Sequence, residues 1–334
     1  MKAAVYRTYG PPSVVRVEDV PTPQPKDHEV LIRISASTVS SADWRVRSLE
    51  LPRGFGLFAR PVFGLFGPRQ PILGTELAGT IEAVGRAVTR FQAGEAVFAF
   101  PGSALGCHAE YRTMPEDGRI ARIPAGLTFD EAAALSFGGT TALYYLRDLA
   151  QVRAGDEVLI VGASGAVGSA AVQLARHFGA RVTGVTSTAN LECVQALGAD
   201  RVLDYTKEDF RRGTATWDII VDTVGATEFA ACAPVLKDEG RLTLVAATLP
   251  QMLGSMRRRR PDGKRVLTGA VKERVEDLLV LQALAAEGHF RPLIDRRYPL
   301  NEIAAAHAYV DTGRKRGSVV ITMGPAAEAA TPSP

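Results

Sequence analysis

A glycine-rich segment, GASGAVG at residues 162–168, shows the clearest chemistry in the sequence. The apolar run DEVLIV at residues 156–161 is typical of a buried strand, and Val167, Ala170 and Leu174 repeat at helical spacing behind the glycines. Small residues between a strand and a helix let the backbone approach phosphates, and the helix N terminus offers unpaired N–H donors. We predict that this turn binds a dinucleotide pyrophosphate; alternatively, its glycines only permit tight helix packing. The candidate contacts are Gly162, Ala163, Ser164, Gly165, Ala166 and Val167.

The end of the next predicted strand bears on the choice of cofactor. An NAD site usually has Asp or Glu about 20 residues after the glycines, where it accepts ribose hydroxyls. Residues 184–190 read GVTSTAN and contain no acid, so NADPH is preferred over NAD, with Thr186, Ser187 and Asn190 as candidate contacts. The stretch also lacks a base for the 2′-phosphate. Arg201 and the basic cluster 314–316 are candidate sources, although a solvated turn is the favoured interpretation of the cluster. Tyr205, Val224 and Val245 complete the predicted cofactor contacts.

Cysteine and histidine usage argues against metal and hydrolytic chemistry. Cys107, Cys193 and Cys232 lie far apart without a CxxC pair, so neither a thiolate metal cluster nor a disulfide framework is expected. The five histidines are scattered, and none pairs with an acid and a nucleophile at a recognisable spacing. His108 is interpreted as structural or surface-exposed rather than as part of a site.

The elements that position these residues fall into two parts. The first 120 residues show short strands at residues 3–6, 14–19, 29–36, 78–84 and 96–100. From about residue 124, strands alternate with helices, which predicts a parallel, doubly wound α/β sheet. A helix is expected at residues 226–236 and another at 273–287. The run 257–260 is interpreted as a solvated basic loop and residues 324–334 as a frayed end.

Length and charge set limits on the class of protein. A chain of 334 residues favours two domains, and a net charge of +3 with dispersed bases argues against a nucleic-acid partner. No apolar run reaches the roughly 18 residues needed to span a bilayer, and the N terminus is unlike a signal peptide. We therefore expect a cytoplasmic protein with a small-molecule substrate and no membrane partner.

Three motifs carry a family resemblance over almost the whole chain. The chain resembles the medium-chain dehydrogenase/reductase superfamily, in its zeta-crystallin-like quinone oxidoreductase branch. The motifs that carry the resemblance are GTELAGTIEAVG at residues 74–85, VSSADW at 39–44 and the turn at 162–168. The resemblance implies a β-rich GroES-like substrate domain at residues 1–123, completed by 289–334, and a Rossmann NADP-binding domain at 124–288. It also implies a homodimer.

The departures from the family pattern concern zinc. Thr75 stands where the zinc alcohol dehydrogenases have a ligating His, Ser40 or Ser41 replaces a ligating Cys, and residues 135–139 contain no Cys. A zinc site needs three or four N, S or O ligands, so we expect no catalytic metal.

Without zinc, the resemblance implies that hydride passes from NADPH to a small, fairly apolar electrophile such as an enone or quinone. We expect Ser40, Trp44 and Thr141 to be catalytic, Thr141 by resemblance beside the nicotinamide. Each has a structural alternative: Ser40 as a turn cap, Trp44 as domain core and Thr141 as a helix start. The alternative functions are a zinc-independent alcohol or aldehyde dehydrogenase and a non-catalytic NADPH-binding protein.

Residues 51–67 form a predicted apolar loop that contains Phe55, Phe58, Phe63 and Phe66. A long apolar loop is unusual unless it covers something. A substrate lid is the favoured interpretation, ahead of a partner contact and a local packing cluster.

Overall fold

The computed structural model describes residues 1–255 and 262–324. The predicted basic loop at 257–260 and nearly all of the predicted frayed end lie outside the described residues. None of the described helices is both long and apolar enough to cross a bilayer.

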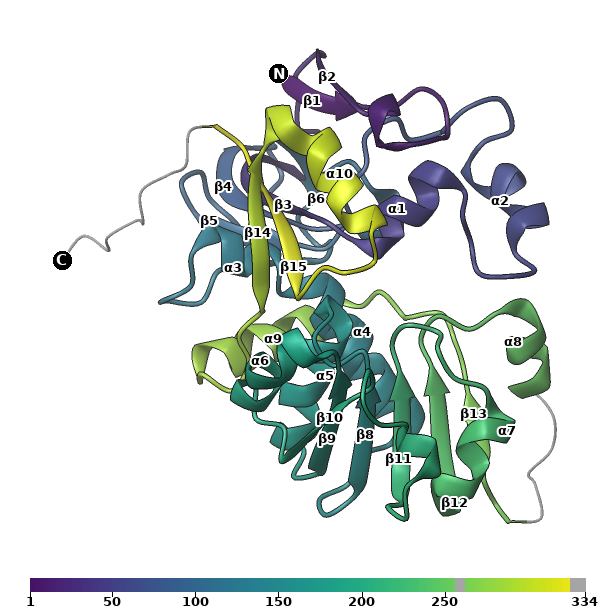
Figure 1. The fold of residues 1–334 in the computed structure, drawn as a ribbon. Helices are drawn as coiled ribbons and strands as arrows, with labels where there is room; N and C mark the ends of the chain where they lie inside the picture. Colours follow the sequence, from purple (N-terminus) through teal and green to yellow (C-terminus); the bar gives the residue numbers. More distant parts are fainter. Residues whose placement is uncertain (256–261, 325–334) are drawn as a thin grey trace. The chain divides into compact units, whose positions relative to one another are not determined.

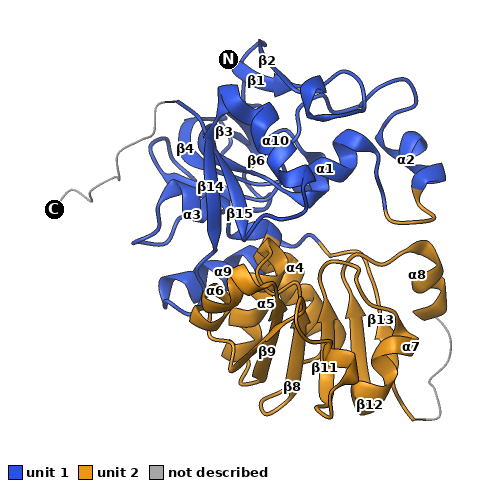
Figure 2. Cartoon of the chain, viewed as in Figure 1, with its two compact units in different colours: residues 1–51, 56–137, 273–334 blue, residues 52–55, 138–272 orange. Residues whose placement is uncertain are grey.

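The chain divides into two compact units, coloured separately in Figure 2. The first contains Met1–Leu51, Gly56–Phe137 and Glu273–Pro334, and the second contains Pro52–Phe55 and Gly138–Lys272. The expected boundaries differ from these, because residues 124–137 and 273–288 cluster with the first unit. One reason is that α9 (Val275–Ala286) contacts β7 (Ile120–Arg122), where the Gln282 amide donates to the Arg122 carbonyl at 2.7 Å.

The second unit is built on a six-stranded parallel sheet of order β10-β9-β8-β11-β12-β13. Its strands are β8 (Glu157–Val161), β9 (Arg181–Thr186), β10 (Arg201–Asp204), β11 (Trp217–Asp222), β12 (Leu236–Leu244) and β13 (Arg265–Leu267). Its helices are α5 (Ala166–His177), α6 (Leu191–Ala196), α7 (Phe229–Cys232) and α8 (Leu249–Ser255), and α4 (Ser136–Leu143) continues as a π-helix over Tyr144–Ala150. The order reverses between β8 and β11, which confirms the predicted doubly wound Rossmann sheet (Figure 1).

The predicted helix at residues 226–236 is largely wrong. The structure has only α7, followed by a 3-10 turn over Ala233–Val235 and then β12. Pro234 lies at the start of that turn and has no N–H to donate, so an α-helix cannot continue through it.

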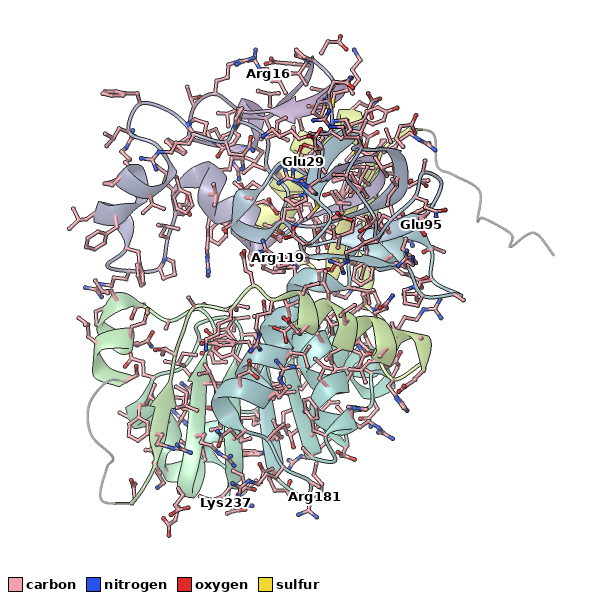
Figure 3. The ribbon with its side chains drawn as sticks, turned by 180° about the vertical axis from the view of Figure 1, so that it is seen from behind. Arg16, Glu29, Glu95, Arg119, Arg181 and Lys237 are labelled. Carbon is pink, nitrogen blue, oxygen red and sulfur yellow. The ribbon has the colours of Figure 1, made fainter. Side chains whose placement is uncertain are left out.

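Ion pairs tie together the amino ends of the parallel strands. Arg181 Nε lies 2.5 Å from Glu157 Oε1, and Lys237 Nζ lies 2.7 Å from Asp218 Oδ2. Figure 3 shows Arg181 and Lys237 at the same end of the second unit. The carboxyl ends of the strands form the opposite edge, where ligands of such sheets bind.

The first unit contains a seven-stranded sheet and a separate two-stranded one, confirming the β-rich GroES-like domain. The sheet has the path β14-β15-β3-β4-β5-β7, with β6 also paired to β3. The strands other than β7 are β1 (Lys2–Val5), β2 (Arg16–Asp19), β3 (Glu29–Val39), β4 (Leu77–Val84), β5 (Ala96–Ala99), β6 (Tyr111–Pro115), β14 (Ile294–Pro299) and β15 (Ser318–Thr322). The helices besides α9 are α1 (Ser41–Ser48), α2 (Gly56–Phe63), α3 (Phe129–Ala133) and α10 (Ile303–Asp311).

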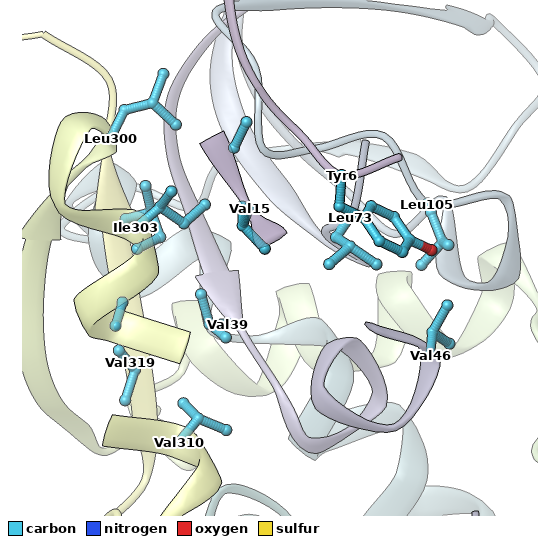
Figure 4. Packing of buried hydrophobic residues seen from close by; sticks show 13 residues of the cluster. Tyr6, Val15, Val39, Val46, Leu73, Leu105, Leu300, Ile303, Val310 and Val319 are labelled. Atoms are coloured by element: carbon cyan, nitrogen blue, oxygen red, sulfur yellow. The ribbon is translucent and has the colours of Figure 1, made fainter. Parts of the chain in front are cut away.

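An apolar cluster that includes Tyr6, Leu73, Ile303 and Val319 packs beneath α1 and α10 (Figure 4). The Arg47 guanidinium of α1 is fully buried beside this cluster and donates to both carboxylate oxygens of Asp311 in α10 at 2.6 Å. Burial of apolar area and this bidentate pair together fix the two helices.

The predicted loop at residues 51–67 is wrong in one respect, since α2 occupies its centre. Ala59 and Phe63 are four residues apart on the side of α2 that packs on the rest of the first unit. Ala59 is buried, and Phe63 packs on the apolar cluster. This tertiary contact stabilises a short helix despite Pro61 within it.

Candidate functional site

The glycine turn at the carboxyl end of β8 has both packed and open positions. Gly162 has a φ of +79°, and a Cβ on Gly168 would lie 2.0 Å from the Gly162 carbonyl oxygen, so backbone packing requires glycine at both. A Cβ on Gly165 would meet only the Gly162 oxygen, at an ordinary 3.5 Å. Backbone packing therefore does not require glycine at residue 165, which is consistent with close approach of a ligand there.

Gly165 is also the N-cap of α5 and provides no side-chain cap. The first-turn amides of Ala166, Val167 and Gly168 have no partner within an α-helix, and the helix dipole adds partial positive charge there. An anionic ligand would satisfy both conditions. We call this turn, with the predicted contacts Gly162, Ala163, Ser164, Gly165, Ala166 and Val167, the phosphate cradle, and phosphate binding there stays a prediction.

Hydroxyl and amide groups gather beside this cradle. The Ser164 hydroxyl accepts from Thr186 Oγ1 at 2.9 Å and from Asn190 Nδ2 at 3.2 Å, and the Asn190 amide also reaches Ser187 Oγ. The structure thus brings together four residues that the sequence analysis chose separately. Among their described hydrogen-bond partners there is no carboxylate, which leaves the cluster compatible with a 2′-phosphate.

A basic group linked to the end of β10 through Asp204 is Lys207, which the sequence analysis missed. Asp204 ends β10, accepts from Thr188 Oγ1 at 2.5 Å and from Thr206 Oγ1 at 2.7 Å, and lies 3.8 Å from Lys207 Nζ. The hydrogen bond from Thr188, followed by those from Thr206 and the Lys207 charge, holds the pKa of Asp204 below its usual value. The sequence signal that could have identified Lys207 is its position three residues after Asp204, the acidic residue at the end of the strand.

Of the two charge sources suggested from the sequence, Arg201 lies before the carboxyl edge and the basic cluster belongs to the other unit. Arg201 pairs in register with Thr183, three residues before the carboxyl edge, or about 10 Å along the strand. The 314–316 cluster belongs to the first unit, where Lys315 Nζ donates to the Gly317 carbonyl and Arg316 pairs with Asp295. Burial lowers the pKa of Lys315 to about 8.

The remaining cofactor candidates also meet the carboxyl edge. The Tyr205 amide donates to the Thr186 carbonyl at 3.0 Å, and the Val245 amide donates to the Asp222 carbonyl at 2.9 Å. A Cβ on Gly162 would lie 2.6 Å from Val224 Cγ1, which places Val224 at the point where the strand order reverses.

Asp222 organises the turn that carries Val224, a role the sequence analysis missed. Its buried carboxylate accepts from the amides of Val224 and Gly225 through one oxygen and from the amide and hydroxyl of Thr227 through the other. The signal was available, since Asp at a strand end before a Thr-Val-Gly turn is typical of an Asx-type turn.

Thr141 lies on α4 near the phosphate cradle. A Cβ on Gly138 would lie 2.5 Å from the Ala166 carbonyl oxygen, so glycine lets α4 approach the first turn of α5. Thr141 follows Gly138 by three residues on the same side of the helix and is 7% exposed.

Ser40 and Trp44 belong to the first unit and have structural partners there. Ser40 is the N-cap of α1: its hydroxyl donates to Asp43 Oδ2 at 2.6 Å and accepts from the Ala42 amide at 3.2 Å. Its single proton is thus committed to Asp43. Trp44 is partly buried against the apolar cluster. The structure therefore shows each in the structural role weighed as an alternative, and a catalytic role stays a prediction.

The positions expected for zinc ligands do not fit the ion. Ser40 is held by Asp43, Thr75 is buried, and Glu76 accepts from Thr38 Oγ1 at 2.5 Å and from the Phe137 amide at 2.6 Å. Complete burial raises the pKa of Glu76 to about 7. No group of three or more His, Cys, Asp or Glu within 1–255 and 262–324 is arranged to hold a metal ion.

Two family models match the chain. The alcohol dehydrogenase GroES-like domain matches residues 26–125, and the zinc-binding dehydrogenase domain matches residues 197–321. Together they cover parts of both units.

Similar proteins reduce or oxidise small carbonyl compounds, by their names. The chain is 33% identical over 333 residues to 2-methylene-furan-3-one reductase of Solanum lycopersicum, covering 96% of this chain and 79% of the relative. It is 29% identical to the chloroplastic NADPH-dependent alkenal/one oxidoreductase of Arabidopsis thaliana, covering 96% and 79%. The solved quinone oxidoreductase of Coxiella burnetii superposes with a TM-score of 0.84 at 29% identity, covering 96% and 99%. The chain therefore belongs to the medium-chain dehydrogenase/reductase superfamily and is a quinone oxidoreductase-like, NAD(P)-dependent oxidoreductase.

Proposed function

We propose that this oxidoreductase uses NADPH in preference to NADH, without catalytic zinc, to reduce a small and fairly apolar enone or quinone. The observation that carries the cofactor preference is the Ser164–Thr186–Asn190 cluster, which offers hydroxyl and amide groups where an NAD site usually has a carboxylate. The names of the enone- and quinone-reducing relatives support the substrate class.

When bound, the nicotinamide supplies the hydride, and the protein contributes binding, orientation and electrostatics. The first turn of α5 stabilises the pyrophosphate, while α4 holds Thr141 beside the cradle through the close approach at Gly138. Hydride addition to the β-carbon of an enone leaves negative charge on the carbonyl oxygen, which a hydrogen-bond donor stabilises. Thr141 is our first candidate for that donor, because Gly138 brings its helix close to the first turn of α5, and Ser40 is the second. Water completes the reaction by protonating the α-carbon.

Turnover with a panel of substrates tests the reaction class. We expect NADPH oxidation with enones and quinones and products in which the double bond, not the carbonyl, is reduced. Alcohol products would favour a zinc-independent alcohol or aldehyde dehydrogenase, and NADPH binding without turnover would favour a non-catalytic binding protein. Metal analysis of the purified protein is the companion measurement, because stoichiometric zinc would contradict the zinc-free assignment.

Lys207 gives a test of the cofactor preference. We propose that its exposed ammonium, next to the Thr188–Asp204–Thr206 cluster, pairs with the 2′-phosphate. Lys207→Gln should raise the KM for NADPH about tenfold and leave the KM for NADH unchanged, since an ion pair to phosphate contributes on the order of 1–2 kcal/mol. Lys237→Gln, at the amino edge of the same sheet, is the matched control. Equal effects of Lys207→Gln on both cofactors would contradict the assignment.

The homodimer remains a proposal as well. β13 is an edge strand of the six-stranded sheet, and an unpaired strand edge can pair with a second copy around a two-fold axis. Light scattering of the purified protein measures the oligomeric state, and a monomer at micromolar concentration would contradict it.

A further inference from the structure

Exposed apolar side chains concentrate on α2 and the turn behind it. Leu57, Phe58, Val62, Leu65 and Phe66 are 87%, 56%, 58%, 56% and 100% exposed, respectively. They account for five of the eleven exposed large hydrophobic residues among the described residues, within a stretch of ten positions. Single exposed hydrophobic residues need no explanation, but a concentration of five within ten positions points to an interaction surface. We call these five residues the α2 patch.

The α2 patch is presented by a helix that is anchored on its other side. Ala59 is buried, Phe63 packs on the apolar cluster of the first unit, and the Tyr9 hydroxyl donates to the Gly64 carbonyl at 3.0 Å. The Arg60 guanidinium also lies 5.6 Å from the centre of the Tyr9 ring. Because these contacts hold α2 in place, folding of this segment onto the first unit does not bury the patch.

The charge around the patch has one sign. Arg60 and Arg69 are exposed, and no acidic residue occurs between Glu50 and Glu76. α2 exposes leucine, phenylalanine and valine side chains beside one base, Arg60, and Arg69 follows in the next turn. Exposed apolar side chains flanked by bases are the composition of a segment that lies in the plane of a membrane surface. Anionic headgroups attract such a cluster of bases.

The charge also argues against a second copy of this chain as the occupant. An interface with two-fold symmetry places the same patch on both partners, so Arg60 and Arg69 would meet their own copies without an acidic partner in the segment. An anionic, apolar surface satisfies both features of the patch at once. We propose that α2 and residues 64–69 dock this protein on anionic lipid bilayers.

This surface association differs from the membrane partnership that the sequence analysis excluded. The proposal revises that expectation: it rested on the lack of a segment long enough to span a bilayer, whereas an interfacial helix inserts only its apolar side chains. The proposal does not depend on the proposed function, because binding to vesicles is measured without cofactor or substrate.

Co-flotation with vesicles tests the proposal on the full-length protein. We expect binding to vesicles of equal parts phosphatidylcholine and phosphatidylglycerol, little binding to phosphatidylcholine alone, and weakening at 1 M salt, where the Debye length is about 3 Å. Replacing Leu57, Phe58 and Phe66 together with Ser should weaken binding at least about tenfold. Arg69→Gln should weaken it about fivefold.

Matched variants separate the patch from general effects. Leu279→Ser with Val280→Ser removes exposed apolar side chains from α9, and Arg16→Gln removes an exposed base from β2; neither should change vesicle binding. The triple Ser variant should keep the thermal stability and the oligomeric state of the parent protein. Absence of co-flotation with anionic vesicles would overturn the proposal. So would a triple variant that still binds vesicles but loses turnover of a water-soluble enone, which is the result expected of a substrate lid.

Discussion

Substituting Gly168 and Gly165 separately by Ala distinguishes the packing role of the glycine turn from its ligand role. A Cβ at residue 168 would lie 2.0 Å from the Gly162 carbonyl oxygen and 2.9 Å from the Ala163 Cα, both backbone atoms of the turn itself. Because backbone cannot yield as a flexible side chain does, Gly168→Ala must displace the turn or the start of α5. Overpacking of this kind typically costs about 1–3 kcal/mol, and each kcal/mol lowers the Tm by roughly 2–4 °C for a unit of this size.

Gly165→Ala should behave in the opposite way. Its Cβ would meet only one protein atom, at 3.5 Å, and its φ of −75° suits any residue. Loss of the glycine N-cap costs no more than about 1 kcal/mol, while the added methyl group occupies the space assigned to the pyrophosphate. We expect Gly165→Ala to keep its Tm within a few degrees and lose at least about tenfold in NADPH affinity.

The assay combines thermal unfolding without cofactor and fluorescence titration with NADPH for the parent and both variants. Gly168→Ala should lower both the Tm and the affinity for NADPH. Gly165→Ala should lower only the affinity for NADPH. If Gly165→Ala bound NADPH as tightly as the parent protein, the phosphate cradle would be misplaced. A Gly168→Ala protein of undiminished stability would refute the packing argument.

Two further predictions concern buried charge in the first unit. His307 is fully buried, and desolvation, followed by the charges of neighbouring groups, holds its pKa well below 6.5, so it stays neutral in the folded protein while the unfolded chain gains a proton. The free energy of unfolding should therefore fall by about 2 kcal/mol between pH 7 and pH 5 from this group, and urea titrations of a His307→Leu variant should lack that part of the pH dependence. Asp311→Ala leaves the buried Arg47 guanidinium without its carboxylate, and it should lower the free energy of unfolding, measured in urea, by about 3–5 kcal/mol. The control Asp27→Ala breaks the exposed pair with Arg86 and should lower the free energy of unfolding by less than about 1 kcal/mol. Equal losses in the two variants would contradict the argument from burial.

Local pattern determined much of this protein. The apolar run before residue 162, the glycines after it and the serial strand–helix units predicted a Rossmann sheet because period and turn chemistry depend on near neighbours. The same local information placed Ser164, Thr186, Ser187 and Asn190 among the cofactor contacts, because each follows a predicted strand whose carboxyl end faces the ligand edge. The local pattern did not predict the hydrogen bonds that these side chains make with one another.

Tertiary contacts decided the rest. Ser40 could be a donor or a cap from its type alone, and only the approach of Asp43 commits its proton. Arg201 and Lys207 are both bases near β10. The parallel register of β10 with β9 puts Arg201 before the carboxyl edge, whereas Lys207 follows Asp204 at the end of the strand. Residues 51–67 carry no periodic signal strong enough for a helix, and α2 forms because Phe63 finds the apolar cluster. In each case a contact made in the folded protein decides the role of the residue. Sequence spacing determines which residues share a face of a helix or strand, but not which distant group that face contacts.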